Sequence, residues 1–451
     1  MTYRKISILG AGTPFMPSLI YAATENKEAL AGSEFCLMDI DPESLPKLAK
    51  LGEVLAERVN ADFKFSFTND AKEAVEDSDF ILPSYRIGGR KHMLYDIKIP
   101  TKYGIAGDET TGPGGTFMAQ CTIPTTLEYC KMINDMCPDA WIISYINPAS
   151  HVADAVWRKT NLKYIPVCDC VAANIMLFLP RVLEKPPLNR KYTISDDYEP
   201  RSIGLNHFTW LVDLKLDGIE GYSLLKEKLI QKMKTGEVFK IIAQFPWMPL
   251  DFGLGFKFLE LYDVWSTSSS HITPYWEHER TLKERSREPL WEDTIFGWTE
   301  KRWNFLEEIL SGKNYEEYPE EYCFNPFHAR QAIGVLSSIA ADEQKEWGGI
   351  LFRNNGIISN LPEDAVVEGH AIVDKKGINP INIGDLPKPF IGISRQVIEW
   401  QELSVDAALT GDKNILYQAI LACPYVIDTI PAKKIMDELL VAHSEFMPQF
   451  K

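Results

Sequence analysis

The sequence lacks any long uninterrupted hydrophobic run. None of its 451 residues fall in a window that resembles the span of about twenty apolar residues needed to cross a bilayer. Residues 1–17 carry two cations followed by apolar side chains, as a signal peptide would, but Gly10, Gly12, Pro14 and Pro17 interrupt that stretch. We therefore expect neither a membrane span nor a secretory leader.

Positive charge is also in short supply. The chain has 47 Lys and Arg against 63 Asp and Glu, which gives a net charge of −16 and a pI near 5.1. Nucleic acids and anionic membrane surfaces both bind clustered Lys and Arg, so we expect neither as a partner. The same acidity repels anionic small molecules, and a substrate of that kind would need a local basic pocket.

The eight cysteines lack the dense, even spacing of a disulfide scaffold, and we find no internal repeat or low-complexity tract. A reducing cytoplasm is the simplest location for such a chain. With 45% apolar residues, the chain is long enough for a large core and two domains.

Apolar segments alternate with segments of helical spacing in the first part of the chain. The predicted strands are 5–10, 34–40, 79–84, 140–146 and 163–168, and the predicted helices are 18–26, 42–59, 122–136, 148–160 and 171–183. Each strand is apolar on both faces, which is typical of a buried parallel sheet. The pattern therefore predicts an α/β fold with a doubly wound parallel sheet of the Rossmann type.

The pattern changes near residue 185. Strand-like segments at 192–197, 201–208 and 210–218 are followed by mixed sequence rich in aromatic residues and by a helical tail. We expect a Rossmann domain over residues 1–188 and an α+β domain over residues 189–451.

A glycine-containing turn follows the first predicted strand. Gly10 permits the tight turn, and Gly12 lets the backbone approach a pyrophosphate at the N-terminus of the next helix. Phe15 stands in place of the third glycine of the dinucleotide fingerprint, and a lone G-x-G also occurs in ordinary turns. Asp39 ends the second strand, where a carboxylate can accept from a ribose hydroxyl. Its charge would repel a 2′-phosphate, which favours NAD over NADP.

Two further segments are open to two interpretations each. Asn147 ends the fourth strand, where ligands bind in open α/β sheets, but it could equally cap a helix with Pro148 at the first position. Residues 107–115 contain four glycines and a proline around Asp108 and Glu109. That segment is either a connector or a loop shaped around a ligand.

Cys168 ends the fifth strand, and His207 lies near the end of another strand-like segment. A thiolate and an imidazole suit a borderline divalent cation, and two ligands leave positions open for water or substrate. Spacing alone favours two unrelated buried side chains. Cys168 and Cys170 form a C-x-C pair without a second one, so we expect no structural zinc site.

Taken in order, the motifs of this chain resemble glycoside hydrolase family 4, whose members are NAD- and metal-dependent glycosidases with a fold similar to lactate and malate dehydrogenases. The motifs are GAGTPFMP (10–17), DID (39–41), YRIGG (85–89), IPTKYGIAGDETTGPGG (99–115), PDAWIISYINPA (138–149), CD (168–169), GLNHF (204–208) and the segment 365–387. An aromatic residue in place of the third glycine is usual in that family. The likeness spans essentially the whole chain.

The resemblance implies roles for particular residues. Cys168 and His207 would hold a divalent ion, with Mn²⁺ expected. Asp169 matches the general acid of some members, although others carry Asn or His there. Tyr275, in SSSHITPYW (268–276), would be the catalytic base, and Tyr262 is the competing candidate. The expected NAD⁺ contacts are Gly10, Gly12, Thr13, Pro14, Asp39 and Asn147, and the expected substrate contacts are Asn147, Arg86, Glu109, Asn206 and His271.

The reaction implied is hydrolysis of a glycosidic bond through transient oxidation at C3 of the sugar, deprotonation at C2 and elimination of the aglycone. The alternative is an NAD-dependent 2-hydroxyacid dehydrogenase of the lactate or malate type. In either case we expect a homodimer or homotetramer.

The sugar itself stays open between a galactoside or glucoside, a uronide and a 6-phosphoglycoside, of either anomer. An anionic group would need Arg or Lys. Arg280, Arg285 and Arg287 are possible sources, but the alternating charges around them favour a solvated helix. Arg86 and Arg90 are the alternatives.

Overall fold

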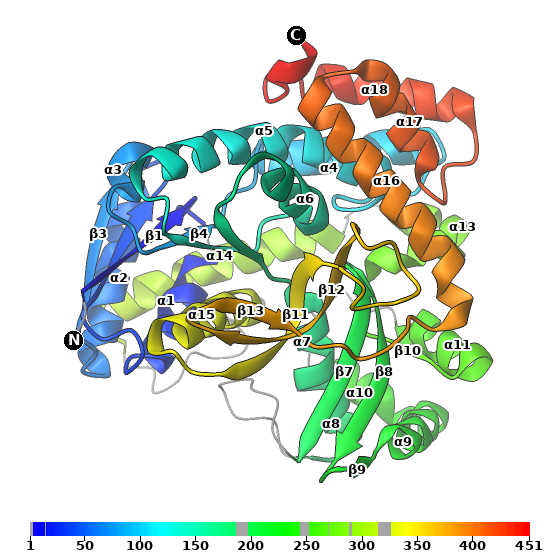
Figure 1. The fold of residues 1–451 in the computed structure, drawn as a ribbon, viewed down its shortest axis with the longest axis horizontal. Coiled ribbons are helices and arrows are strands. Elements are labelled where there is room, and N and C mark those ends of the chain that lie inside the picture. Colours follow the sequence, from blue (N-terminus) through cyan, green and yellow to red (C-terminus); the bar gives the residue numbers. More distant parts are fainter. Residues whose placement is uncertain are drawn as a thin grey trace.

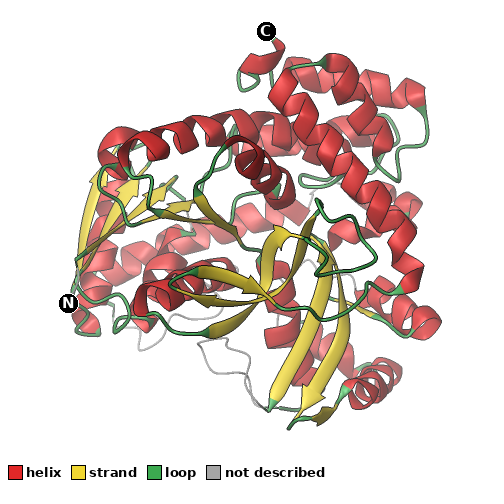
Figure 2. Cartoon of the chain, viewed as in Figure 1, coloured by secondary structure: helices red, strands yellow, loops and turns green. Residues whose placement is uncertain are grey.

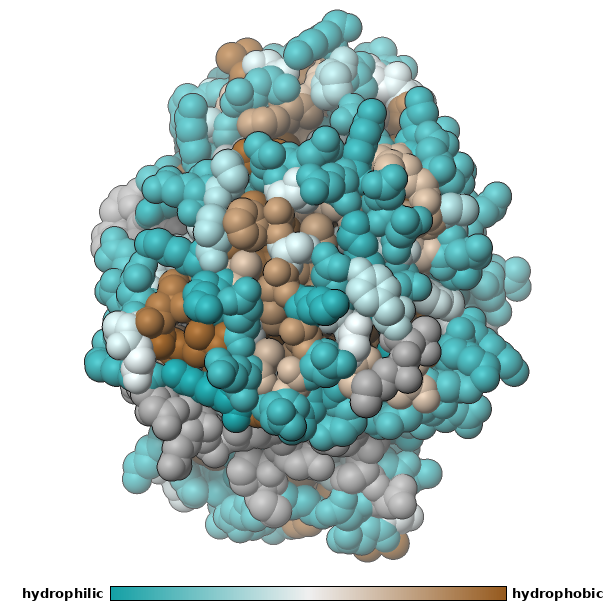
Figure 3. Space-filling view, turned by 90° about the vertical axis from the view of Figure 1, so that its left-hand side faces the viewer, coloured by the Kyte–Doolittle hydropathy of each residue, from teal (hydrophilic) through white to brown (hydrophobic). Residues whose placement is uncertain are grey.

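The computed structural model describes residues 3–13, 15–185, 197–243, 252–268, 270–287, 291–313 and 326–451. Two sheets form its framework, and helices cover them (Figures 1 and 2). Hydrophilic residues occupy most of the face that lies on the left of Figure 1 (Figure 3). Within the described residues, no helix combines the length and the apolar character that a membrane span requires.

The first sheet is parallel and has six strands in the order β3-β2-β1-β4-β5-β6. Its strands are β1 (Arg4–Leu9), β2 (Ser33–Met38), β3 (Phe63–Thr68), β4 (Phe80–Pro83), β5 (Trp141–Ser144) and β6 (Lys163–Pro166). This order confirms the predicted Rossmann-type sheet. The sequence analysis missed β3 because it is an edge strand with exposed side chains, so it has no continuous apolar run.

Helices flank this sheet on both faces. The helices of this half are α1 (Met16–Glu25), α2 (Leu45–Arg58), α3 (Ala71–Val75), α4 (Gly89–Lys102), α5 (Gly112–Met136), α6 (Ala149–Lys159), α7 (Asp169–Ala173) and α8 (Leu179–Val182), with a π-helical turn at Asn174–Phe178 before α8. Of these, α8 belongs to the core cluster that contains Leu211 and Leu214, which lie in the second half of the chain. The sequence analysis did not predict α4, which is rich in polar residues and contains Pro100. Helix α5 begins at Gly112 instead of residue 122.

The second sheet is antiparallel. It consists of β7 (Tyr198–Leu205), β8 (Phe208–Leu216), β9 (Ile219–Glu220), β10 (Trp265–Ser266), β11 (Lys345–Arg353), β12 (Val366–Asp374) and β13 (Gly377–Pro380), with β10-β8-β7-β12-β11 as its main path. The predicted strand at 192–197 lies almost wholly outside the described residues. The predicted domain boundary at 188/189 lies outside them as well.

The helices of the second half are α9 (Tyr222–Thr235), α10 (Glu237–Ile242), α11 (Phe252–Tyr262), α12 (Thr273–Trp276), α13 (His278–Arg285), α14 (Trp291–Leu310), α15 (Pro326–Ala341), α16 (Ile391–Thr410), α17 (Lys413–Ala422) and α18 (Thr429–Ala442). The last three form the predicted helical tail. Helix α15 packs on α1, and α16 packs on α5 and α6. The second half of the chain therefore helps to bury the first sheet.

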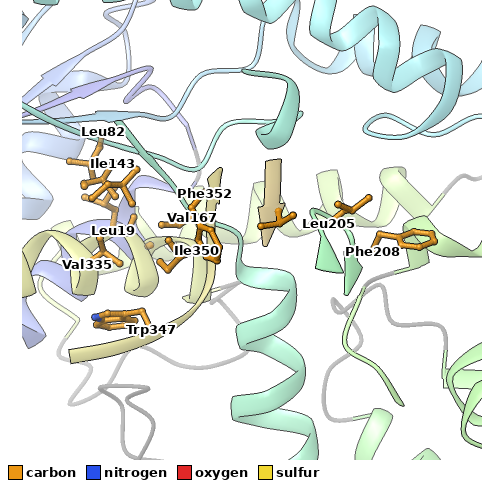
Figure 4. Packing of buried hydrophobic residues seen from close by; sticks show 14 of the residues in the cluster. Leu19, Leu82, Ile143, Val167, Leu205, Phe208, Val335, Trp347, Ile350 and Phe352 are labelled. Atoms are coloured by element: carbon orange, nitrogen blue, oxygen red, sulfur yellow. The ribbon is translucent and has the colours of Figure 1, made fainter. Parts of the chain in front are cut away.

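The two sheets meet at the carboxyl end of β6. There Val167 pairs with Ile350 of β11, and the backbone N–H of Cys168 donates to the carbonyl of Gly349 at 2.8 Å. One apolar core continues across this junction (Figure 4). It includes Leu19, Leu82, Ile143, Val167, Leu205, Phe208, Val335, Trp347, Ile350 and Phe352. The junction therefore holds Cys168 in a fixed place between the sheets.

Close packing explains the glycines of segment 107–115, and two of them, Gly107 and Gly114, contact the backbone of α4. A Cβ on Gly107 would lie 1.8 Å from the carbonyl oxygen of Ile97, and one on Gly114 would lie 2.4 Å from that of Asp96. The segment passes directly into α5, whose first residue is Gly112. Close packing therefore accounts for these glycines, and the choice between a connector and a loop shaped around a ligand stays open.

We expect Gly114→Ala to lower the free energy of unfolding by about 3 kcal/mol, because the new methyl group would overlap two backbone carbonyls. Denaturant unfolding monitored by circular dichroism measures this change. Gly392→Ala is the matched control, since it lies on the exposed face of α16 with open space around its Cβ position. That variant should gain about 0.5–1 kcal/mol. Equal stability of the two variants would contradict the prediction.

Candidate active site

A tight turn joins β1 to α1 at the carboxyl end of the first sheet. Gly10 has a φ of +89°, a conformation that favours glycine. A Cβ on Gly12 would lie 2.9 Å from the carboxyl group of Asp39, which accepts from the N–H of Gly12 at 2.8 Å. Gly10, Gly12 and Asp39 therefore form one preorganised unit in the place where a Rossmann fold binds a dinucleotide.

A buried arginine from a distant part of the chain packs on the next residues of this turn, and no sequence pattern predicted it. Thr13 accepts from the N–H of Phe15 through its hydroxyl at 3.3 Å, and Pro14 lies outside the described residues. The guanidinium of Arg302 lies 4.7 Å from the centre of the Phe15 ring, and this arginine is only 2% exposed. It comes from α14, far away in sequence, so no local motif could reveal it.

Asn147 follows β5 and precedes a cis peptide bond to Pro148. Helix α6 begins at Ala149, with Pro148 at the capping position and no side-chain cap. The interpretation of Asn147 as a helix cap with Pro148 at the first helical position is therefore wrong. Asn147 instead lies half-buried at the carboxyl edge of the sheet, which is also the edge where the glycine turn follows β1.

The structure brings Cys168 and His207 together. Cys168 precedes α7, and His207 occupies the tight turn between β7 and β8 with a φ of +60°. Their ligand atoms and the sulfur of Cys170 all lie within 4.8 Å of one another. Cys170 is a third potential donor that the sequence analysis had set aside, because only the turn into α7 directs it back toward Cys168.

Asp169 is the first residue of α7 and is 2% exposed. Its charge acts on Glu368 of β12, a buried carboxyl group that the sequence analysis missed. Burial raises the pKa of Glu368 to about 8, against the opposing effect of a hydrogen bond from Asn206 at 2.9 Å. The hydrogen bond to Glu368 holds the predicted substrate contact Asn206 in place.

A second buried carboxyl group, Asp108, organises the opposite wall of the site. It accepts from the N–H groups of Thr110 at 2.8 Å and Thr111 at 3.1 Å, and it pairs with His271 at 2.8 Å and with Arg285 at 3.4 Å. Burial alone would raise the pKa of Asp108, but the charges of His271 and Arg285 outweigh it and hold that pKa well below its ordinary value.

His271 connects this carboxyl group to the predicted metal ligand His207. The two imidazole rings stack with centres 4.5 Å apart. Burial lowers the pKa of His271, but the Asp108 carboxylate more than compensates and raises it above the usual value. His271 thus lies beside His207, as predicted for a substrate contact, and is already bound to a carboxylate.

The structure pairs some of the cations that could bind an anionic substrate and leaves others exposed. Arg280 forms ion pairs with two glutamates of its own region, as a solvated helix does. That interpretation is wrong for Arg285, which turns inward to Asp108 and is 13% exposed in its side chain. Arg287 lies exposed after α13, and Arg90 is exposed on α4.

Arg86 and Glu109, two predicted substrate contacts, pair with each other. The distance between their charged groups is 2.6 Å, and Arg86 also lies 3.5 Å from the buried carboxylate of Asp96. Arg86 therefore faces two carboxylates, those of Glu109 and Asp96.

Tyr275 lies on α12 and lines one small cavity together with Asn206 and His207. Its ring packs edge-on against those of Phe208 and Tyr425. Burial, with smaller contributions from Cys423 and Asp108, raises the pKa of Tyr275 well above its usual value.

The competing candidate, Tyr262, ends α11. It is 42% exposed and packs on Phe258 and Phe390, outside the lining of that cavity. Of the two tyrosines, Tyr275 is the one that the structure places beside His207.

Comparison with known proteins gives consistent matches. The model of the family 4 glycosyl hydrolases matches residues 5–184, and that of the family's C-terminal domain matches residues 202–426. A probable 6-phospho-beta-glucosidase of Bacillus subtilis is 30% identical over 99% of this chain and 98% of its own length, and an alpha-galactosidase of the same organism is 29% identical over 99% of this chain and its whole length.

Solved structures share the fold over the full chain. A 6-phospho-alpha-glucosidase from gut microorganisms, in complex with NAD and Mn²⁺, has a TM-score of 0.86 at 22% identity and 100% coverage of both chains. The 6-phospho-beta glucosidase of Thermotoga maritima, with manganese, NAD⁺ and glucose-6-phosphate, has a TM-score of 0.82 at 23% identity, covering 98% of this chain and 99% of that one.

Proposed function

Because the chain belongs to the family 4 glycosyl hydrolases, we propose that Cys168, His207 and Tyr275 form the active site of a glycosidase that uses NAD⁺ and a divalent metal ion. The membership confirms the family resemblance, and the alternative of a 2-hydroxyacid dehydrogenase is wrong. One observation carries the assignment of the site: His207 lies within 4.8 Å of the Cys168 sulfur and shares a cavity with Tyr275.

The residues present fit both cofactors. The sulfur and imidazole donors suit a borderline cation such as Mn²⁺ or Zn²⁺. The turn of Gly10 and Gly12, fixed by Asp39, suits an NAD pyrophosphate and ribose. When bound, NAD⁺ supplies a hydride acceptor and the cation supplies a Lewis acid.

The chain's own residues account for the proton transfers. Tyr275 takes the proton from C2 of the sugar, and Asp169, in its protonated form, gives its proton to the departing oxygen. Burial raises the pKa of Tyr275 in the protein alone, so a positive charge held at His207 is needed to make the tyrosine a base near neutral pH. Asn147 and Asn206 orient the sugar hydroxyls.

We further propose that the preferred glycoside carries neither a phosphate nor a carboxylate. Relatives of similar identity include both a 6-phospho-beta-glucosidase and an alpha-galactosidase, so relatedness leaves this open. Recognition of a phosphate requires cations that are not neutralised. Among the described cations, Arg86 already faces Glu109 and His271 and Arg285 face Asp108, whereas Arg90 and Arg287 are exposed to solvent. Withdrawing a cation from a buried partner leaves an uncompensated charge, which is costly.

A panel of nitrophenyl glycosides tests both proposals. It should comprise neutral, 6-phosphorylated and uronic sugars of both anomers, assayed with NAD⁺, Mn²⁺ and a thiol reductant. We expect the best neutral glycoside to have a kcat/KM at least about tenfold above its 6-phosphorylated counterpart, which corresponds to about 1.4 kcal/mol. Parallel assays with EDTA or without NAD⁺ should show no cleavage. Preference for the phosphorylated sugar would refute the neutral substrate, and failure to cleave any glycoside would refute the glycosidase.

We also infer a cytoplasmic enzyme that assembles as a homodimer or homotetramer. None of the seven cysteines in the described residues forms a disulfide, which suits a reducing compartment. Sedimentation velocity of the purified chain measures the assembly.

A further inference from the structure

His151 lies in the first turn of α6, four residues after Asn147, and is 2% exposed. Neither of its ring nitrogens has a hydrogen-bond partner among the described residues. Its ring packs edge-on against Trp400 of α16, with centres 4.9 Å apart. A buried polar group without partners is costly, so its presence calls for an explanation.

The position of His151 supplies that explanation. It lines the same cavity as Asn206, His207 and Tyr275, on the side formed by α6 and α16. His151 therefore belongs to the wall of the cavity that His207 and Tyr275 line, and its two nitrogens are without partners among the described residues at that wall.

The chemistry of the ring limits what it can bind. Burial lowers the pKa of His151 to about 3, so the imidazole is neutral at working pH. A neutral imidazole has one N–H donor and one acceptor nitrogen. A hydroxyl group both donates and accepts and can therefore match either nitrogen. A phosphate or carboxylate only accepts, and its charge would face the lone pair of the second nitrogen.

We propose that His151 binds a hydroxyl of the sugar that the reaction leaves unchanged, the one on C4 or C6, and so determines substrate specificity. The inference rests on the proposed function, in which the oxygens on C2 and C3 belong to the reacting centre.

The test combines two variants with two modified substrates. His151→Leu removes both polar atoms at similar volume, and His151→Gln keeps one donor and one acceptor. Both are assayed, with the parent, on the preferred glycoside and on its 4-deoxy and 6-deoxy forms. In the parent, one deoxy form should lose about tenfold in kcat/KM. In His151→Leu that same loss should disappear, because the hydroxyl has no partner left, and in His151→Gln it should largely return.

Thermal unfolding of the metal- and NAD-free protein separates this role from a structural one. Leu in place of an unpartnered buried imidazole should raise Tm by about 2 °C. His370→Leu is the matched control. His370 is also fully buried, but it accepts from the N–H of Ser202 and pairs with Glu346. This control should lower Tm and leave the effect of deoxygenation as in the parent.

Each contrary outcome has a distinct meaning. An unchanged deoxy effect in His151→Leu, with the parent active, overturns this inference and leaves the glycosidase intact. If His151→Leu lowers Tm and the deoxy substrate still loses kcat/KM as in the parent, His151 is a core residue. Weaker NAD⁺ binding alone, measured by calorimetry, assigns it to the nicotinamide carboxamide instead. A parent that cleaves no glycoside removes the proposed function together with this inference.

Discussion

Replacing Cys168 by alanine is expected to abolish tight Mn²⁺ binding and to lower kcat/KM for the preferred glycoside by more than about a hundredfold. The sulfur of Cys168 and the imidazole of His207 are the donors that the fold fixes most firmly. A backbone hydrogen bond to Gly349 holds the first, and a two-residue turn holds the second. Removal of one donor leaves the cation with too few protein ligands to compete with water. Calorimetric titration with Mn²⁺ measures the loss independently of activity.

Two further alanine variants sharpen this experiment. Cys130→Ala is the matched control, because Cys130 is equally buried but lies in α5, within the core of the first sheet. It should keep full metal affinity. Cys170→Ala decides whether the third donor of the cluster takes part: an affinity close to the parent's makes Cys168 and His207 the protein ligands, and a comparable loss adds Cys170 to them. Parent-like Mn²⁺ binding by Cys168→Ala would refute the metal site.

The sequence specifies the first sheet well because its strands are buried on both faces. Continuous apolar runs at β1, β2, β4, β5 and β6 have no competing interpretation apart from a short buried helix. The edge strand β3 and the polar helix α4 lack that signal, and neither was predicted. Helix α5 was predicted too short because its first turn is made of Gly112, Pro113 and two more glycines, which are poor helix formers required there by close contacts with α4, Thr110 and Tyr425.

The residues of the site also fall into those that the sequence could locate and those that it could not. Cys168 and Asn147 could be located because each follows a recognisable strand, and the family resemblance supplied His207 and Tyr275. The partners of these residues could not be found in this way. Asp108 is paired with His271 across 163 positions of sequence, and Asn206 with Glu368 across 162. Asn206 meets Glu368 because β7 pairs with β12 in the second sheet, and Asp108 meets His271 only when their segments pack together. No local pattern in the sequence records either contact.

Arg285 shows where charge alternation along a helix gives a wrong prediction of side-chain exposure. Arg285 lies in a segment of alternating charges and was expected to face solvent, like Arg280. Its side chain instead reaches Asp108, because α13 follows directly after the segment that carries His271 and Tyr275. Charge alternation reports the average exposure of a helix and not the direction of one side chain.

Tyr275→Phe is expected to lower kcat by about a thousandfold, the usual contribution of a positioned general base. The variant keeps the ring that packs on Phe208 and Tyr425, so folding and Mn²⁺ affinity should match those of the parent. In ²H₂O the parent should place deuterium at C2 of the released sugar, since the proton removed there passes to the phenolate and exchanges with solvent. The variant should leave that position unlabelled in recovered substrate.

Tyr262→Phe distinguishes a base from a tyrosine that merely lies nearby. Tyr262 is exposed and packs on Phe390, away from the cavity that holds His207, so its hydroxyl is expected to be dispensable. Should Tyr262→Phe lose activity and C2 labelling while Tyr275→Phe keeps both, the assignment of the base is reversed. Should product from the parent carry no deuterium at C2, no tyrosine acts there. In that case the raised pKa of Tyr275 would reflect only its apolar surroundings, and the bond would have to break without a carbanion at C2.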